Sequence, residues 1–340
     1  MTFEVLRRAT LLPAVVCSAF LSVSLSMSLS ISLPAQARVQ VTRPPSAARV
    51  PAFYAKFVSA EGYPIVASAG VSDYALLEAA YLVNAMLAQR PDVRAAMIAS
   101  GSRLCILGHD QFTTDLPEFA WLAQKASPDL PGFSGKDYWD ARARGTGGSE
   151  TDPYCSCGEE NLLGYRGDPY ATECILIHEF AHNIHLRGLV RIDETFDPRV
   201  RAAFQAAVGK GLWKGTYAAT NHHEYFAEGV QSWFDNNRHD DHDHNHVDTR
   251  VELIEYDSGL ADLCREVFGD TELRYTKPAT RLRDHLDGYD PSAAPAFVWP
   301  ERLAEVKAAI VARAQARARA AKGEPAAPAA SKALPANERR

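Results

Sequence analysis

The sequence feature that most constrains this chain is the pattern His-Glu-x-x-His at residues 178–182. On a helix, positions four apart lie on the same face, so His178 and His182 can present ring nitrogens to one ion. Glu179 lies beside them, where its carboxylate can reach a water molecule bound to that ion. The spacing therefore predicts the two-histidine half of a catalytic zinc site.

The residues before this pattern predict that its helix is mostly buried. An apolar run at residues 175–177 leads into His178. Two histidines and a glutamate in a buried helix cost free energy unless something pairs with them. The alternative interpretation is a helix whose histidines are satisfied by hydrogen bonds alone. We favour the metal site because each residue of the pattern has a defined role in it.

A catalytic zinc site needs a third protein ligand and an open fourth position. A histidine six residues after His182 would complete one known arrangement, but Gly188 occupies that position. His185 lies on the same stripe of the helix, yet one helix cannot easily place three ligands around a tetrahedral ion. We therefore expect His185 to support a ligand or to face solvent, and we expect a glutamate from a later helix as the third ligand.

A second helix is predicted within residues 217–234, where apolar residues recur at close to helical spacing. It carries Glu224 and Glu228, which are four positions apart and therefore share a face. Spacing alone does not tell which of the two glutamates would bind the metal.

The two helices together resemble the catalytic domain of the anthrax lethal factor family, whose relatives include the secreted Pro-Pro endopeptidases. That family has a His-Glu-x-x-His helix and, some forty residues later, a tyrosine. Seven residues after the tyrosine comes a Glu-aromatic-aromatic-Ala-Glu block. Here Glu224 follows His182 by 42 positions and Tyr217 by 7. The resemblance covers roughly residues 170–236 of the 340.

This resemblance implies a role for each residue that matches the family pattern. It makes Glu224 the third zinc ligand, and it places Tyr217 beside the catalytic zinc, where its phenol can steady an oxyanion. Glu228 becomes a supporting residue near the ligand histidines, and Glu179 is the expected general base. The implied protein is a zinc metalloendopeptidase with one catalytic Zn²⁺ and an α+β fold, mainly helical and zincin-like, with a small sheet.

Two other functions are compatible with the same motifs. A catalytically silent, secreted binding protein would keep the fold and the zinc, but it would not need Glu179 as a general base. A metal scavenger would act through the histidine- and aspartate-rich tract at residues 238–246. For that tract we favour a solvated acidic loop beside the site.

Residues 1–37 are expected to be a secretory signal peptide. Arg7 and Arg8 precede an apolar, serine-rich run at residues 11–33, and a small-x-small cleavage site follows at residues 35–37. A retained membrane anchor is the alternative, because the run is long enough to span a bilayer. Its many serines and the cleavage site favour export, so we expect an extracellular or periplasmic protein without a stable membrane span.

The amino-acid composition divides the rest of the chain into a linker, a domain, a C-terminal helix and a tail. Residues 38–51 are rich in proline, arginine and serine and are expected to be a linker, and residues 52–290 form the predicted zincin-like domain. A C-terminal helix is predicted within residues 291–322, and residues 323–340 are expected to be disordered. The formal net charge of −6 gives no indication of nucleic acid, so the expected partner is a peptide or protein substrate.

Local patterns predict several further elements. A hairpin is expected at residues 53–67, a helix capped by Ser72, a strand at residues 103–108 and a helix at residues 193–208. A helix is also expected at residues 249–268, broken near residues 257–259.

Two segments bear on how a substrate would be held. The glycine-rich residues 145–148 do not follow a strand and open a helix, so they are interpreted as a surface loop and not as a phosphate loop. Residues 158–165 are the candidate edge strand beside the metal helix, along which a peptide would add as a further strand.

Five cysteines follow the predicted signal peptide: Cys105, Cys155, Cys157, Cys174 and Cys264. A secreted context permits disulfides, but an odd number leaves at least one cysteine unpaired or bonded to another chain. The sequence does not give their connectivity.

Overall fold

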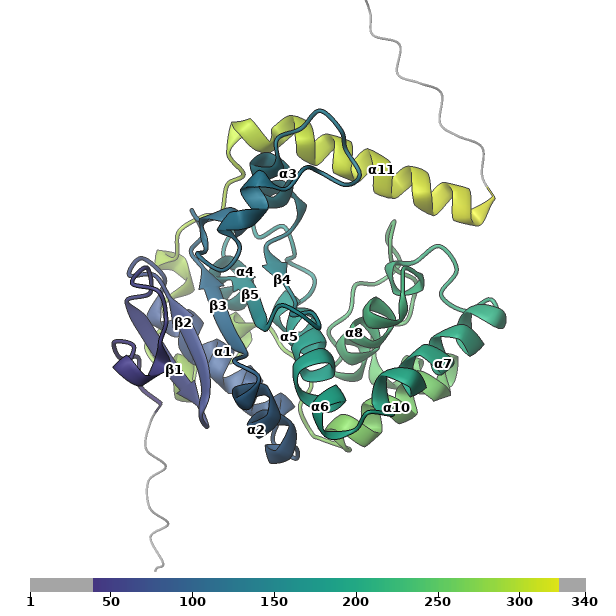
Figure 1. The fold of residues 1–340 in the computed structure, drawn as a ribbon, viewed down its shortest axis with the longest axis horizontal. Coiled ribbons are helices and arrows are strands. Elements are labelled where there is room, and N and C mark those ends of the chain that lie inside the picture. Colours follow the sequence, from purple (N-terminus) through teal and green to yellow (C-terminus); the bar gives the residue numbers. More distant parts are fainter. Residues whose placement is uncertain (1–38, 324–340) are drawn as a thin grey trace, which may run out of the picture. The chain divides into compact units, whose positions relative to one another are not determined.

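The computed structural model describes residues 39–323. The predicted signal peptide and nearly all of the predicted disordered tail lie outside the described residues. Within them the fold is α+β, as expected, with one small sheet and many helices (Figure 1). None of the helices in this part of the chain is both long and apolar enough to cross a membrane.

Within residues 39–323 the sheet has five strands in the order β1-β2-β3-β5-β4. They are β1 (Lys56–Ala60), β2 (Tyr63–Ala67), β3 (Arg103–Leu107), β4 (Gly145–Thr146) and β5 (Tyr154–Gly158). The three central strands run parallel, and β1 and β4 pair antiparallel at the two edges. The predicted hairpin and the predicted strand at residues 103–108 are confirmed.

The hairpin turns at Glu61 and Gly62, which both have positive φ, 50° and 95°. In a turn with two consecutive residues of positive φ, the backbone twist matches the right-handed twist of the flanking strands. Glycine tolerates that backbone without strain, whereas a residue with a side chain adopts it less readily.

The first group of helices lies in the first part of the described chain. It comprises α1 (Asp73–Met86), α2 (Pro91–Ala99), α3 (Gly135–Arg142), α4 (Glu159–Leu163), α5 (Ile175–Asn183), a π-helical segment (Ile184–Leu189) and α6 (Val190–Ile192). Of this group, α1, α2, α4 and α5 contact the sheet. The helix that carries the His-Glu-x-x-His pattern is α5. Its residues Leu176, Ile177 and Phe180 have no exposed surface, so burial of its apolar side fixes α5 in the core.

The second group of helices follows in the C-terminal half of the described chain. It comprises α7 (Phe196–Gly209), α8 (His222–Trp233), α9 (Arg250–Tyr256), α10 (Ser258–Phe268) and α11 (Ala304–Lys322). The break between α9 and α10 falls at Asp257, as predicted. Its Oδ1 accepts a hydrogen bond from the backbone N–H of Leu260 at 3.2 Å, and its Oδ2 accepts one from the Tyr225 hydroxyl at 2.7 Å.

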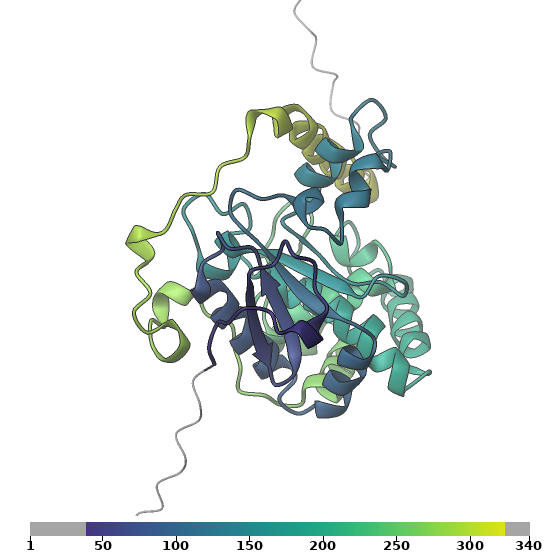
Figure 2. The ribbon, with the colours of Figure 1, turned by 60° about the vertical axis from the view of Figure 1, so that its left-hand side comes forward.

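Helix α11 lies beside α3 in both views (Figures 1 and 2). Arg302, just before α11, pairs with Asp137 at 2.5 Å and with the fully buried Asp140 at 2.7 Å. Farther along, Arg313 pairs with Asp129 at 3.2 Å. These ion pairs hold α11 against α3 and the loop before α3, although more than 150 residues separate the two helices in the sequence.

The prediction of an edge strand at residues 158–165 is wrong, because most of this segment is the helix α4. The side chain of Glu160 pairs with Arg144 at 2.6 Å, and neither side chain has exposed surface. The helix ends at Gly164, whose φ of 68° is the left-handed conformation that terminates helices. The edge of the sheet beside α5 is β4 instead.

Within residues 38–51, predicted as a linker, Val41 and Thr42 contact the folded part of the chain. Thr42 and Phe57 exchange two backbone hydrogen bonds of 2.9 and 2.8 Å, and Val41 packs against the core. All five cysteines of the described chain are buried and none forms a disulfide.

Candidate metal centre

The start of α5 is set by side chains from two other segments. The amide oxygen of Asn236 accepts a hydrogen bond from the backbone N–H of Cys174 at 2.7 Å. The amide oxygen of Asn161 accepts one from the N–H of Ile175 at 2.8 Å. These contacts satisfy donors that a helix leaves unpaired in its first turn, and they fix the position from which His178 and His182 project.

The start of α8 is set by its own sequence. The side-chain oxygen of Asn221 accepts hydrogen bonds from the backbone N–H groups of His223 and Glu224, at 2.8 and 3.0 Å. Asparagine is among the preferred residues at this position. The opposite side of α8 is held in the core by Phe226 and Trp233, which are fully buried. Glu224 is thereby placed in the first turn, facing α5.

The structure brings the three predicted ligands together. Nε2 of His178 lies 3.0 Å from Oε2 of Glu224 and 3.2 Å from Nε2 of His182. Nε2 of His182 lies 3.3 Å from the same Oε2. Zinc bonds of about 2.0–2.2 Å place tetrahedral ligand atoms roughly 3.3–3.6 Å apart. The observed separations of 3.0–3.3 Å lie at or slightly below this range, so one small cation fits among the three atoms after a small outward movement of the side chains.

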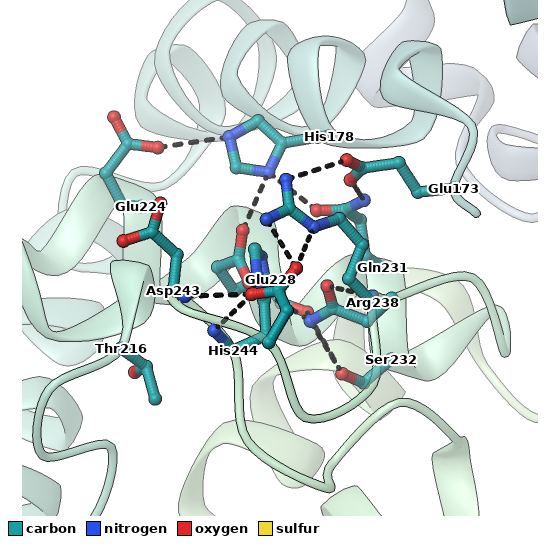
Figure 3. A network of polar contacts seen from close by, with 12 residues as sticks. Glu173, His178, Thr216, Glu224, Glu228, Gln231, Ser232, Arg238, Asp243 and His244 are labelled. Carbon is teal, nitrogen blue, oxygen red and sulfur yellow. Dashed lines mark hydrogen bonds and ion pairs between the residues drawn. The ribbon is translucent and has the colours of Figure 1, made fainter. Parts of the chain in front are cut away.

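A contact on the side of His178 away from the other candidate ligands determines which of its ring nitrogens carries the proton (Figure 3). Nδ1 of His178 lies 2.8 Å from Oε1 of Gln231, and Nε2 of Gln231 donates to Glu173 at 2.7 Å. Because the amide nitrogen is engaged with Glu173, the amide oxygen faces the ring and accepts its Nδ1–H. Nε2 of His178 is then left with the lone pair that a metal requires.

Glu228 lies in the same network, one helical turn after Glu224. Its Oε1 is 3.4 Å from Nδ1 of His178, and its Oε2 is 3.2 Å from Nε2 of His244. Asn237 donates a further hydrogen bond to Oε2 at 3.1 Å. Burial raises the pKa of the Glu228 carboxyl, but the neighbouring imidazoles of His244 and His178 outweigh this and hold the pKa well below its usual value.

Glu179 projects from α5 beside the two histidines and lines the same cleft. Burial raises the pKa of Glu179 above that of an ordinary carboxyl group, against the attraction of His178 and His182. A carboxylate with a raised pKa is a stronger proton acceptor than an exposed one.

Tyr217 lines the cleft from the segment before α8. Its ring centre is 6.1 Å from that of His178, and its backbone N–H donates to the carbonyl oxygen of Asp243 at 2.6 Å. Burial, followed by the negative charge of Glu224, raises the pKa of Tyr217 well above its usual value. The phenol therefore stays protonated and can donate a hydrogen bond into the cleft.

The glycine-rich segment at residues 145–148 packs directly on α5, so its interpretation as a surface loop is wrong. A Cβ on Gly147 would lie 2.6 Å from Cβ and Cδ2 of His182, and a Cβ on Gly145 would lie 3.0 Å from Cγ of Glu179. The N–H of Gly148 donates to the side chain of Asn183. Glycine is required here because the backbone of β4 and of the turn after it touches the metal helix.

These residues line a cleft of about 830 Å³. The three candidate ligands, Glu179 and Tyr217 lie in it, and β4 with its following turn forms part of its wall. Helix α11 contributes Arg313 and Arg317 from the far C-terminal part of the described chain. Arg317 lies 3.8 Å from Asp243, next to His244.

The expectation that His185 could face solvent is wrong, because it has no exposed surface. As expected, it is not one of the grouped candidate ligands His178, His182 and Glu224, and its Nε2 lies 3.3 Å from Oδ1 of Asp197. Gln231, which the sequence reasoning missed, is the residue that orients His178. A signal for it exists in the sequence, because Gln231 follows Glu224 by two helical turns and so shares its face.

Comparisons with known proteins give a similarity in structure only. No protein-family model matches the sequence, and no curated protein matches it. Among solved structures, the chain is similar to the Pro-Pro endopeptidase from Paenibacillus alvei, with 15% identity and a TM-score of 0.42. The similarity covers 60% of this chain and 97% of that one. At this level of similarity, the function has to be inferred from the residues of this chain.

Proposed function

We propose that this protein is a secreted zinc metallopeptidase that hydrolyses peptide bonds. The observation that carries the proposal is the convergence of His178, His182 and Glu224, whose nearest side-chain atoms are 3.0–3.3 Å apart. Two imidazoles and one carboxylate are a donor set that suits zinc and leaves a fourth position open. Glu179 and Tyr217 lie in the same cleft, which supplies an acid–base group and a hydrogen-bond donor.

Each residue then has one task. When bound, zinc lowers the pKa of a water molecule and polarises a carbonyl group. Glu179 accepts the proton from the attacking water and returns it to the leaving amine, which is general acid–base catalysis by a single carboxyl group. Tyr217 donates a hydrogen bond to the oxygen on which negative charge develops. Gln231 keeps His178 in the tautomer that binds the metal.

The substrate is proposed to be an extended peptide. Strand β4 lies at an edge of the sheet, and Gly145 and Thr146 both line the cleft. Main-chain hydrogen bonds to such an edge hold a peptide independently of its side chains. The edge passes Glu179 closely, so a peptide added along it would run past the proposed general base.

The proposed function is tested by peptide cleavage that depends on the metal. The mature, zinc-loaded protein is incubated with a broad peptide library, and products are identified by mass spectrometry. Cleavage should stop when a chelator removes the zinc and should return when zinc is restored. If the zinc-loaded protein cleaves no peptide, the proposal fails and a zinc-containing binding protein of the same fold takes its place.

Secretion is a separate part of the proposal and rests on residues 1–37 alone. Expression of the full chain in a bacterial host with a periplasm should yield exported protein. Its N-terminus, read by Edman degradation, should begin at Arg38. An unprocessed chain in the cytoplasm would contradict export without affecting the metal centre.

A further inference from the structure

We propose a second metal site, formed by Asp197, His222 and His223, next to the first one. Oδ1 of Asp197 lies 2.9 Å from Nε2 of His222 and 3.6 Å from Nε2 of His223. One ligand atom from each residue lies within 4.8 Å of the others. Two imidazoles and a carboxylate again form the donor set, so the cation is a zinc-class divalent ion.

Hydrogen bonding alone does not satisfy these side chains. The hydrogen bond between His222 and Oδ1 of Asp197 leaves Nε2 of His223 without a partner among the described residues, although that atom is buried. Buried polar atoms in native proteins are almost always paired, and each exception calls for an explanation. A cation bound by Nε2 of His223 provides one.

His185 gives a second, independent indication at the same place. It is fully buried, and neither of its ring nitrogens has a hydrogen-bond partner within the described chain. Its Nε2 is nevertheless 3.3 Å from Oδ1 of Asp197. The His185 ring therefore borders the proposed ligand group of Asp197, His222 and His223 on the core side, without being one of the three ligands.

The surroundings hold the site in place. Oδ2 of Asp197 is paired with Arg201 at 3.1 Å, one turn along α7, which leaves Oδ1 free to face the histidines. The ring of His185 packs against those of Phe196 and Phe226, with centroid distances of 5.4 and 5.3 Å. A rigid apolar wall and an oriented carboxylate are what a metal site needs around its ligands.

The position of the site suggests what the ion does. Asp197 is in the first turn of α7, and His222 and His223 are in the first turn of α8, immediately before Glu224. A metal bound by all of them ties α7 to α8 beside a ligand of the first site. The ion is therefore structural, and it fixes the turn from which Glu224 projects.

Metal stoichiometry tests this inference separately from the proposed function. Protein without an affinity tag is stripped of metal and titrated with zinc against a chelator of known affinity, and bound metal is measured by mass spectrometry. The wild type should bind two equivalents, and H178A/H182A should retain one. The second equivalent should therefore persist in a variant that has no catalytic metal, whether or not the wild type is a peptidase.

Two variants locate the second equivalent. H222Q/H223Q should lose it, and with Co²⁺ in place of zinc should lose one of two sets of visible absorption bands. The matched control is H239Q/H242Q, which removes two exposed histidines of the nearby tract and should still bind two equivalents. If H222Q/H223Q does not fold, the wild-type titration still decides between one site and two.

Three results would overturn the inference. One is a wild type that binds a single equivalent, which disappears in H178A/H182A. Another is a second equivalent that is lost in H239Q/H242Q, which would mean adventitious metal on the exposed tract. The third is a folded H222Q/H223Q that still binds two equivalents.

Discussion

Nδ1 of His178 lies 2.8 Å from the amide oxygen of Gln231, which is itself held in that orientation by Glu173. This contact determines which nitrogen of His178 faces the candidate metal centre. A metal-binding histidine commonly donates its other N–H to a neighbouring acceptor, and here the acceptor is an amide. The catalytic proposal thus depends on a residue that would not touch the metal.

Gln231→Ala should weaken zinc binding without abolishing it. The substitution removes the acceptor for Nδ1–H, and loss of such an outer partner typically costs about 10–100-fold in affinity. Competition with a chromogenic chelator measures the change. Zinc affinity equal to that of the wild type would show that Gln231 does not orient His178.

Glu224→Ala and Glu228→Ala should differ in the severity of their effect. Glu224 is proposed as a ligand, so its removal should abolish stoichiometric zinc in the first site. Glu228 is 3.4 Å from the far nitrogen of His178, so its removal should cost about 10–100-fold. The same chelator competition separates them. A larger loss in Glu228→Ala would mean that the assignment is wrong by one helical turn.

Gly147→Ala should disturb the metal centre through packing alone. The new Cβ would lie 2.6 Å from two atoms of His182, so either the turn after β4 or the histidine must move. Overpacking of this kind typically costs about 1–3 kcal/mol of stability, and zinc affinity should fall with it. Gly70→Ala is the control, since nothing lies within 4 Å of its added Cβ. Equal unfolding midpoints for the two variants would contradict the close approach.

His244 should make stability depend on pH in the alkaline range. Burial lowers the pKa of His244, but Glu228 and Asp241 outweigh this and raise the pKa from 6.5 to about 9. A pKa raised by folding gives stability that is fully present below pH 6.5 and is lost as the pH rises through about 9. The loss should be at most about 3 kcal/mol.

Urea denaturation of the zinc-loaded protein at pH 6 and pH 9.5 measures this loss. His244→Gln is the control, because it removes the titrating group and should show a smaller decrease over the same interval. Parallel decreases in the two proteins would show that the pair of His244 and Glu228 does not contribute.

The sequence predicted the parts of the site that depend on local periodicity. His178 and His182 are one turn apart on α5, and Glu224 lies on an amphipathic helix with an asparagine cap, so both helices and the facing residues could be inferred. The assignment of Glu224 over Glu228 needed more than spacing. It came from the resemblance of the two linked motifs to a known family.

Features that depend on contacts between distant residues could not be predicted. Residues 158–165 have a pattern compatible with a strand, but Glu160 forms a buried pair with Arg144, and the segment is helical. His185 follows His182 on what the sequence indicates is one helix. The π-helical segment begins at Ile184, and the ring of His185 packs against Phe196 and Phe226 instead. No periodicity indicates that α11 would border the cleft.

The most direct test of the proposed mechanism is to compare Glu179→Gln with the wild type in zinc content and in peptide cleavage. The substitution preserves size and leaves His178, His182 and Glu224 unchanged. Zinc content and fold should therefore be those of the wild type. Cleavage should fall by at least about 10²–10⁴-fold, the usual contribution of a general acid–base group.

Tyr217→Phe, measured alongside, should fall between Glu179→Gln and the wild type, because only one hydrogen bond to the developing charge is removed. A folded, zinc-loaded Glu179→Gln protein without measurable cleavage is the predicted result. A Glu179→Gln protein that cleaves the same peptides as fast as the wild type would contradict the proposed mechanism.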